Sequence, residues 1–200
     1  MTSNNKFRNG SAGNEPMPLD IVRTAFNRMV AGPHPVWVDG GKFPGLPGRW
    51  LRIDEVRQLL LSERLTLSTI DAVWAHLVER SRAGGDAASV ACLGVALPAL
   101  TGVAARLSAP FANDPREIHA GVLYGFCAGL ARVDVTLPGV LTKLRWAAYR
   151  GGMAVVREAL DAAPPTNDRT RGTAPNPKSS RHPDFVLACA VAEKVISGRE

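Results

Sequence analysis

Apolar and polar residues repeat with a helical period over most of the chain, and most clearly over 140–160, VLTKLRWAAYRGGMAVVREAL. At about 100° per residue, the apolar and basic residues of this segment fall on opposite sides of a helix. The predicted buried side carries Val140, Leu144, Ala148, Gly151 and Val155. The opposite side carries Lys143, Trp146, Arg150 and Arg157, all within about 60° of one another.

The basic side of this helix is a candidate surface for nucleic acid. Four basic residues and no acidic residue lie between Lys143 and Arg157. Cations pair with phosphates, and an indole among them stacks on an unpaired base. Two other interpretations stay open, because charged helix faces are commonly solvated and a Trp commonly packs on a neighbouring side chain.

The same period predicts further helices, although their boundaries depend on capping and breaking residues. They cover 19–30, a short segment capped by Asp54, 69–82, 87–108 and 115–133. Ser68 with Asp71 predicts one helix start, and Asp114-Pro115 with Glu117 predicts another. Pro98 predicts a kink or a break near Ala96.

Changes in composition divide the chain into four parts. Residues 1–50 are polar and then dense in Gly and Pro, which predicts a disordered or irregular segment with one possible helix and a short extended piece at 36–38. Residues 51–163 form the predicted helical domain. A basic, Pro-rich linker over 164–183 then leads to a C-terminal helix over 184–200, the start of a truncated second module.

The overall composition favours an all-α protein with a small-residue core. The chain of 200 residues is 46% hydrophobic but only 6% aromatic, so helix packing is favoured over a sheet. Its net charge of +6 permits an acidic partner such as DNA. We find no signal sequence and expect no membrane-spanning run, which predicts a cytoplasmic protein without a membrane partner.

The sequence gives no pattern for catalysis, metal binding or a cofactor. The four histidines lie in different segments, and no HExxH, nucleophile elbow, GxGxxG or phosphate loop occurs. The three cysteines are widely separated, so we predict buried, reduced thiols at Cys92, Cys127 and Cys189. We therefore expect a protein that is not an enzyme and carries no metal or cofactor.

Three consecutive segments carry a resemblance to a known family. They are ALPALTGVAARLSAPF (96–111), DPREIHAGVLYGFCAGLARVDV (114–135) and LPGVLTKLRWAAYRGGMAVVREAL (137–160). Their order resembles the second conserved region of bacterial RNA polymerase sigma factors. In the segments 46–61, 71–82, 94–107 and 182–197 the chain also resembles a group of sigma-like proteins from GC-rich bacteria, a resemblance that covers about 45–197. The resemblance implies a helical bundle of the sigma-region-two type, without the C-terminal helix-turn-helix that would begin near Glu200.

This resemblance also implies site residues. The helix over 115–133 would dock on core RNA polymerase, although Ala120 and Gly121 replace the Gln and acidic residue typical of that helix. The implied partner-binding residues are Glu117, Val122 and Tyr124. The residues implied to contact the melted promoter strand are Trp146, Tyr149, Arg150 and Arg157, which join Lys143 on the same helix.

Two functional hypotheses follow from these patterns. The first is a sigma-like, transcription-associated protein that contacts melted or single-stranded DNA through the helix over 140–160. The alternative is a non-enzymatic helical module that binds a protein partner, either the polymerase or another regulator, without touching DNA. In that case the side with Trp146 would be the binding hot spot.

Overall fold

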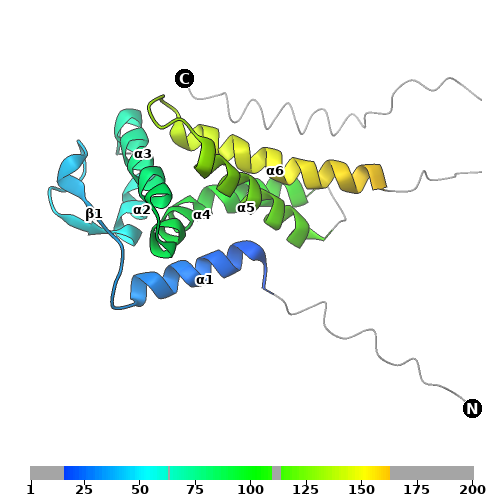
Figure 1. Ribbon diagram of the computed structural model, residues 1–200, viewed down its shortest axis with the longest axis horizontal. Helices are drawn as coiled ribbons and strands as arrows, with labels where there is room; N and C mark the ends of the chain where they lie inside the picture. Colours follow the sequence, from blue (N-terminus) through cyan, green and yellow to red (C-terminus); the bar gives the residue numbers. More distant parts are fainter. Residues whose placement is uncertain (1–15, 63, 110–113, 163–200) are drawn as a thin grey trace, which may run out of the picture. The chain divides into compact units, whose positions relative to one another are not determined.

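Six α-helices and one short β-ribbon form the part of the chain described by this computed structural model, residues 16–62, 64–109 and 114–162 (Figure 1). In chain order the elements are α1 (Pro18–Ala31), β1 (Trp37–Asp39), the 3-10 turn η1 (Gly40–Lys42), β2 (Trp50–Arg52), α2 (Ile53–Leu61), α3 (Leu67–Ala83), α4 (Asp86–Ser108), α5 (Pro115–Arg132) and α6 (Val140–Ala162). The predicted all-α class is confirmed. The predicted linker over 164–183 and helix over 184–200 lie outside the described residues.

Helix α4 is the central element, because the other five helices all pack against it (Figure 1). Its buried residues include Ala96, Leu97 and Leu100 on either side of Pro98. Pro98 itself is exposed, and the helix runs through it without interruption. The predicted possibility of a break is therefore wrong, because packing on the flanking turns holds the helix together despite the missing proline N–H.

Helix α4 also corrects the expectation that the chain has no run of membrane-spanning length. By length and composition alone it could cross a membrane, with a mean hydropathy of 1.9 over its most apolar stretch. Half of that stretch is buried inside the protein. The central helix of a packed core has the same length and composition.

The possible helix expected over 19–30 is confirmed as α1, and the rest of residues 16–50 consists of turns and loops around β1, η1 and the start of β2. The Phe26 ring of α1 lies directly over Gly94 of α4, where an added Cβ would come within 1.7 Å of the ring. Leu19 and Phe26 are each only 1% exposed. These apolar contacts hold α1 against the rest of the helical unit. Residues 1–15 lie outside the described part.

The ribbon follows α1 and pairs β1 with β2 in antiparallel register, Val38 opposite Leu51. Both of these side chains are fully buried. The extended piece expected at 36–38 is confirmed as β1 with a shift of one residue, whereas β2 was not expected. Between the strands, the Asp39 carboxylate accepts a hydrogen bond from the Gly41 N–H at 3.1 Å, which closes the turn.

The predicted helix caps are correct at one of three sites. Asp114 caps α5 and accepts a hydrogen bond from the Arg116 N–H at 2.9 Å, as expected. Helix α3 instead begins after Thr66, whose hydroxyl accepts from the Thr69 N–H at 3.2 Å. Asp54 lies inside the first turn of α2 and pairs with Arg52, so it is not the cap. Several Ser, Thr and Asp residues cluster at these starts, and sequence spacing does not decide which of them is used.

Candidate nucleic-acid interface

The start of α6 is fixed by a side chain from another helix. The Asp71 carboxylate on α3 accepts hydrogen bonds from the Gly139 N–H at 2.7 Å and from the Val140 N–H at 3.0 Å. Free N–H groups at a helix start need acceptors, and a carboxylate is a strong one there. Gly139 has a φ of 80°, a conformation that glycine adopts easily. Asp71, predicted as part of a local capping box, is thus the cap of a helix far along the chain.

Helix α3 also holds the end of α5. The Arg82 guanidinium donates hydrogen bonds to the carbonyl oxygens of Leu130, at 2.7 Å, and Val133. A cation at a helix C-terminus satisfies carbonyls that have no partner within the helix. The connection from α5 to α6 is therefore held at both ends by α3, which fixes the direction in which α6 leaves.

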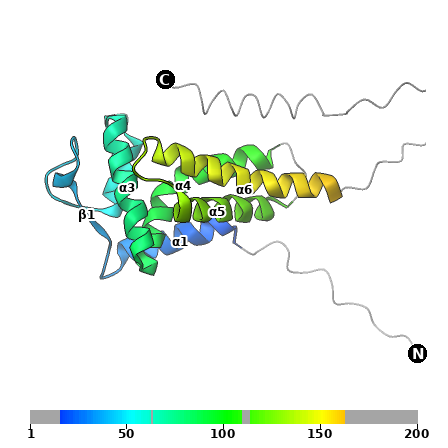
Figure 2. The same ribbon diagram turned by 45° about the horizontal axis from the view of Figure 1, so that its top comes forward.

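Glycines bring α5 and α6 into backbone contact, and the two helices lie side by side in both views (Figures 1 and 2). A Cβ added at Gly151 would lie 2.3 Å from the Gly121 carbonyl oxygen. A Cβ added at Gly125 would lie 2.4 Å from the Ala147 carbonyl oxygen. Any side chain at these positions would push the helices apart. The contact presses one side of α6 against α5.

The buried side of α6 agrees with the predicted apolar side and extends beyond it. Val140, Leu144 and Ala148 are at most 1% exposed. Gly151 and Val155 are partly exposed. Met153 and Val156 are also buried, although the predicted side did not include them. This wider buried side exists because α6 packs against α3 and α4 as well as α5.

The five predicted DNA-contacting residues lie on the remaining side of α6, and we call them the α6 surface: Lys143, Trp146, Tyr149, Arg150 and Arg157. Arg150 and Arg157 are exposed, and the other three are partly exposed. The Trp146 and Tyr149 rings meet edge to face, with centroids 5.6 Å apart and planes at 89°. Lys143 Nζ is 3.4 Å from the Leu137 carbonyl oxygen, a weak contact. Its charge also helps, after the hydrogen bonds from Thr136, to lower the pKa of the exposed Asp134 carboxyl.

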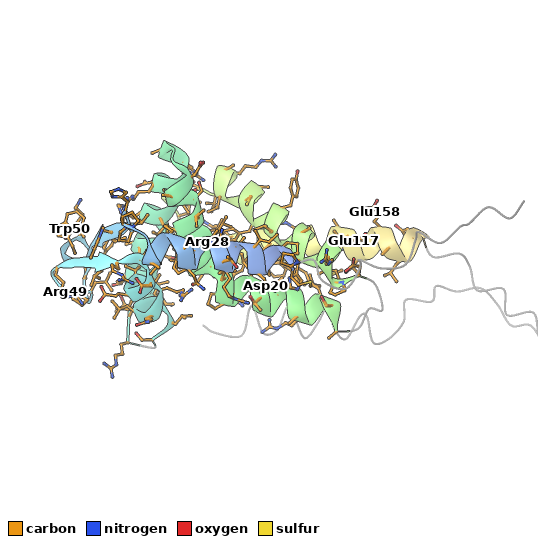
Figure 3. The ribbon with its side chains drawn as sticks, turned by 90° about the horizontal axis from the view of Figure 1, so that it is seen from below. Asp20, Arg28, Arg49, Trp50, Glu117 and Glu158 are labelled. Carbon is orange, nitrogen blue, oxygen red and sulfur yellow. The ribbon has the colours of Figure 1, made fainter. Side chains whose placement is uncertain are left out.

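The cations of the α6 surface have no ion pair within the described part of the chain. The ion pairs found there involve arginines of α1 and of the ribbon region. The first acidic residue of α6 is Glu158, toward the far end of the helix (Figure 3). Lys143, Arg150 and Arg157 are each separated by two turns, so they form a row about 20 Å long.

Arg145 is a further cation of α6 that the sequence did not assign to this surface. It is half-buried, and its Nε atom is enclosed without a hydrogen-bond partner. Burial lowers the pKa of Arg145, and the nearby charge of Arg106 on α4 lowers it further. Arg145 and Arg106 are thus two like charges close together on the packed side of α6. The sequence places Arg145 among the basic residues of α6. Its position on the packed side of the helix is known only from the tertiary structure.

The three predicted partner-binding residues do not share one environment. Glu117 and Tyr124 are exposed and lie two turns apart on the same side of α5. Val122 is fully buried, so a role in direct partner contact is wrong for this structure. The reason is packing: Val122 faces Gly152 of α6, where an added Cβ would lie 2.8 Å from the valine Cγ2.

The described residues contain no cluster of three or more His, Cys, Asp or Glu that could hold a metal ion. Cys92 is buried, and burial raises the pKa of its thiol to about 12. Cys127 is exposed, which corrects the prediction of a buried thiol there. It lies on the side of α5 that faces away from α6. Cys189 lies outside the described residues.

The sequence analysis missed a second surface with aromatic and basic residues, on the ribbon. Trp37 and Trp50 are 42% and 62% exposed and line an open hollow together with residues of α3. A period of two was present in the sequence, since Trp37 and Asp39 flank Val38, and Trp50 and Arg52 flank Leu51. It was not recognised because the surrounding glycines and prolines indicate loop.

Comparison with known proteins adds no relationship: no protein-family model, curated protein or solved structure matches this chain. The functional conclusion therefore rests on the geometry and charge of the described residues and on the resemblance carried by the sequence.

Proposed function

We propose that this protein binds single-stranded or melted DNA through the α6 surface, as a sigma-like, transcription-associated protein. The observation that carries the proposal is the row of Lys143, Arg150 and Arg157 beside the Trp146 ring, with no acidic side chain between them. The row offers phosphate contacts, and the indole offers a stacking surface for an unpaired base. The resemblance of 96–160 to sigma region two supports melted promoter DNA as the target and core RNA polymerase as a partner.

The test is a titration of labelled forked DNA, duplex with one unpaired strand, followed by fluorescence anisotropy over a series of salt concentrations. Three phosphate contacts on a single strand predict a slope of about −2 for log K against log salt. Arg150→Ala should weaken binding and reduce the magnitude of the slope by about 0.7. Trp146→Ala should weaken binding about tenfold with little change in slope, because stacking releases no counterions.

The matched control is Arg28→Ala on α1, which removes the same charge from an exposed site (Figure 3). Helix α1 packs on α4 and α5, away from the α6 surface. The control should bind as the wild type does. The proposal fails if Arg150→Ala and Trp146→Ala both retain wild-type affinity, or if fully paired DNA binds as well as the fork.

A second candidate function is protein binding through α5. Its outward side exposes a stripe of uncharged residues, small except for one aromatic, at helical spacing: Ala120, Tyr124, Cys127 and Ala131. Tyr124 is 76% exposed, which is unusual for a large aromatic side chain without a partner. Sedimentation with core RNA polymerase tests this function. Tyr124→Ala should abolish co-sedimentation and Arg150→Ala should not; equal behaviour of the two variants would contradict it.

A further inference from the structure

The ribbon presents two indoles on one face. In the antiparallel register Trp50 pairs with Asp39, and Trp37 is two residues before Asp39. Both tryptophans therefore point to the same side, opposite the buried Val38 and Leu51. Leaving two indoles partly in water forgoes some of the free energy that their full burial would give. A pair of exposed indoles on one face is typical of a binding surface.

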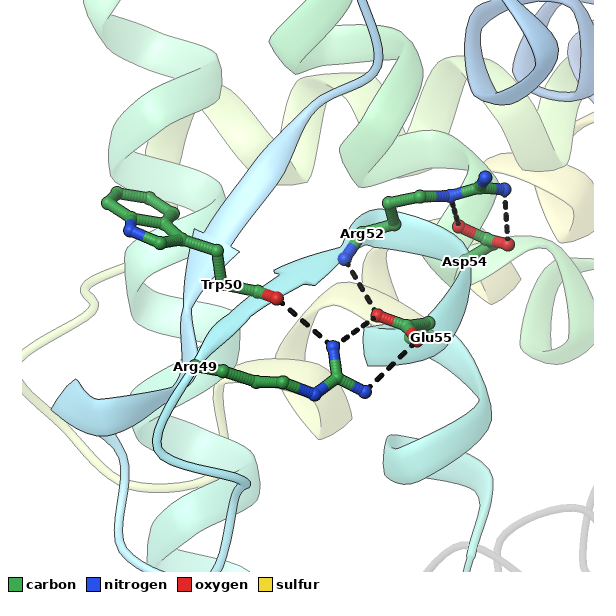
Figure 4. Close-up of polar contacts among 5 residues, drawn as sticks. All are labelled: Arg49, Trp50, Arg52, Asp54 and Glu55. Atoms are coloured by element: carbon green, nitrogen blue, oxygen red, sulfur yellow. Dashed lines mark hydrogen bonds and ion pairs between the residues drawn. The ribbon is translucent and has the colours of Figure 1, made fainter.

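Arginines hold the backbone of both tryptophans. Arg80 Nη1 on α3 donates to the Trp37 carbonyl oxygen at 2.6 Å. Arg49 Nη1 donates to the Trp50 carbonyl oxygen at 3.1 Å, and the same guanidinium makes two hydrogen bonds to Glu55, at 3.1 and 3.2 Å. Figure 4 shows the Trp50 indole directed away from this pair. The ribbon is thus anchored at both strands while the rings stay available, which lowers the entropy cost of binding.

The hollow beside the indoles has the size and the polar groups of a small ligand site. Its volume is about 430 Å³, and its walls are Pro35, Val36, Trp37, Asp39, Lys42, Trp50, His76 and Arg80. Lys42 and Arg80 supply two positive charges. Asp39 adds one negative charge while its carboxylate accepts a hydrogen bond from the Gly41 N–H, so the three charged side chains together stay positive. Burial lowers the pKa of His76, and the positive charges of Arg80 and Lys42 lower it further. The ring is therefore neutral at neutral pH.

We propose that this hollow binds one unpaired nucleotide, with its base on the Trp37 and Trp50 indoles and its phosphate against Lys42 and Arg80. Indoles accept any base because each base has a π-face, and the two cations match one phosphate. The inference rests on the proposed single-strand binding and adds a second contact to it. The two contacts are separate, because Asp71 and Arg80 lie on opposite sides of α3, and these sides face α6 and the ribbon respectively.

Crosslinking locates the contact directly. The full chain is irradiated with an oligonucleotide of 5-iododeoxyuridine, and crosslinked peptides are mapped by mass spectrometry. We expect crosslinks at Trp37 or Trp50 in addition to those at Trp146 or Tyr149. Crosslinks at the α6 residues without any in the ribbon would overturn the ribbon site and leave the proposed function standing. Crosslinks in the ribbon alone would support the ribbon site and contradict the α6 surface.

Affinity for an oligothymidylate tests the same site by substitution. Trp50→Ala and Lys42→Ala should each weaken binding about tenfold. Both side chains are exposed, so the variants should fold, and circular dichroism checks this. Tyr124→Ala is the control for loss of an exposed ring and Arg28→Ala for loss of a charge, and neither should change affinity. Wild-type affinity in both ribbon variants, with a loss in Arg150→Ala, would overturn the ribbon site alone.

Discussion

The two surfaces that combine aromatic and basic side chains are built in different ways. The α6 surface comes from one helix, so a period of 3.6 in the sequence already groups Lys143, Trp146 and Arg150. The ribbon surface joins residues from β1, β2 and α3. Trp37 and Arg80, which share a hydrogen bond there, are 43 positions apart in the chain. A single helical period reveals the first surface. The period of two along each strand does not reveal the second, because it does not show that β1 and β2 pair or that α3 lies beside them.

The surfaces also differ in what holds them in place. The α6 surface depends on the opposite side of the same helix, where glycines place α5 and α6 in backbone contact. The ribbon depends on hydrogen bonds from guanidinium groups to carbonyl oxygens. Substitutions in the helix contact should therefore affect the whole unit, whereas substitutions on the ribbon should act locally.

The largest effect should follow Gly151→Ala. Its Cβ would lie 2.3 Å from the Gly121 carbonyl oxygen, and backbone cannot rotate away as a side chain can. We expect a loss of about 2–3 kcal/mol in the free energy of unfolding, measured by chemical denaturation. The control is Gly102→Ala in α4, where nothing lies within 4 Å of the new Cβ. It should gain about 0.5–1 kcal/mol from helix propensity. If both variants gain stability, the α5–α6 contact is looser than described.

A smaller effect should follow Asp71→Ala, which removes the acceptor of the Gly139 and Val140 N–H groups. Loss of a helix cap costs about 1–2 kcal/mol in the free energy of unfolding. Hydrogen exchange should accelerate first in the early turns of α6, while amides of the ribbon stay protected. Glu79→Gln, an exposed acid on the same helix, is the control and should leave both quantities unchanged. Uniform acceleration across the unit would contradict a local capping role.

The smallest effect concerns His76, beside the ribbon hollow. Burial lowers its pKa below the ordinary 6.5, and the positive charges of Arg80 and Lys42 lower it further. Below pH 6.5 the unfolded chain therefore binds more protons than the folded one, so His76 reduces stability as the pH falls from 6.5 toward the folded pKa. His76→Gln should flatten this part of the pH dependence of the melting temperature. The exposed His34→Gln is the comparison, and an equal flattening there would exclude a specific role for His76.

The local features of the fold could be predicted from the sequence to a large extent. The expected start of α5 at Asp114-Pro115 and the span of α6 agree with the structure because caps and apolar periods act over a few residues. Helix α1 was also expected, but its packing against α4 could not be predicted in this way. Phe26 packs over Gly94, and such a contact between distant segments leaves no local pattern. For the same reason Asp71 was assigned to its own helix when it caps another.

By itself, the sequence determined the all-α class, the apolar side of α6 and the grouping of Lys143, Trp146, Arg150 and Arg157, because each follows from the geometry of a single helix. The tertiary structure decided that Val122 is buried, that Arg145 is half-buried near Arg106, and that two tryptophans share one face of a ribbon. These features arise where separate segments meet. Their physical causes are backbone contact at glycines and hydrogen bonds across long stretches of chain, and neither has a period that a sequence can display.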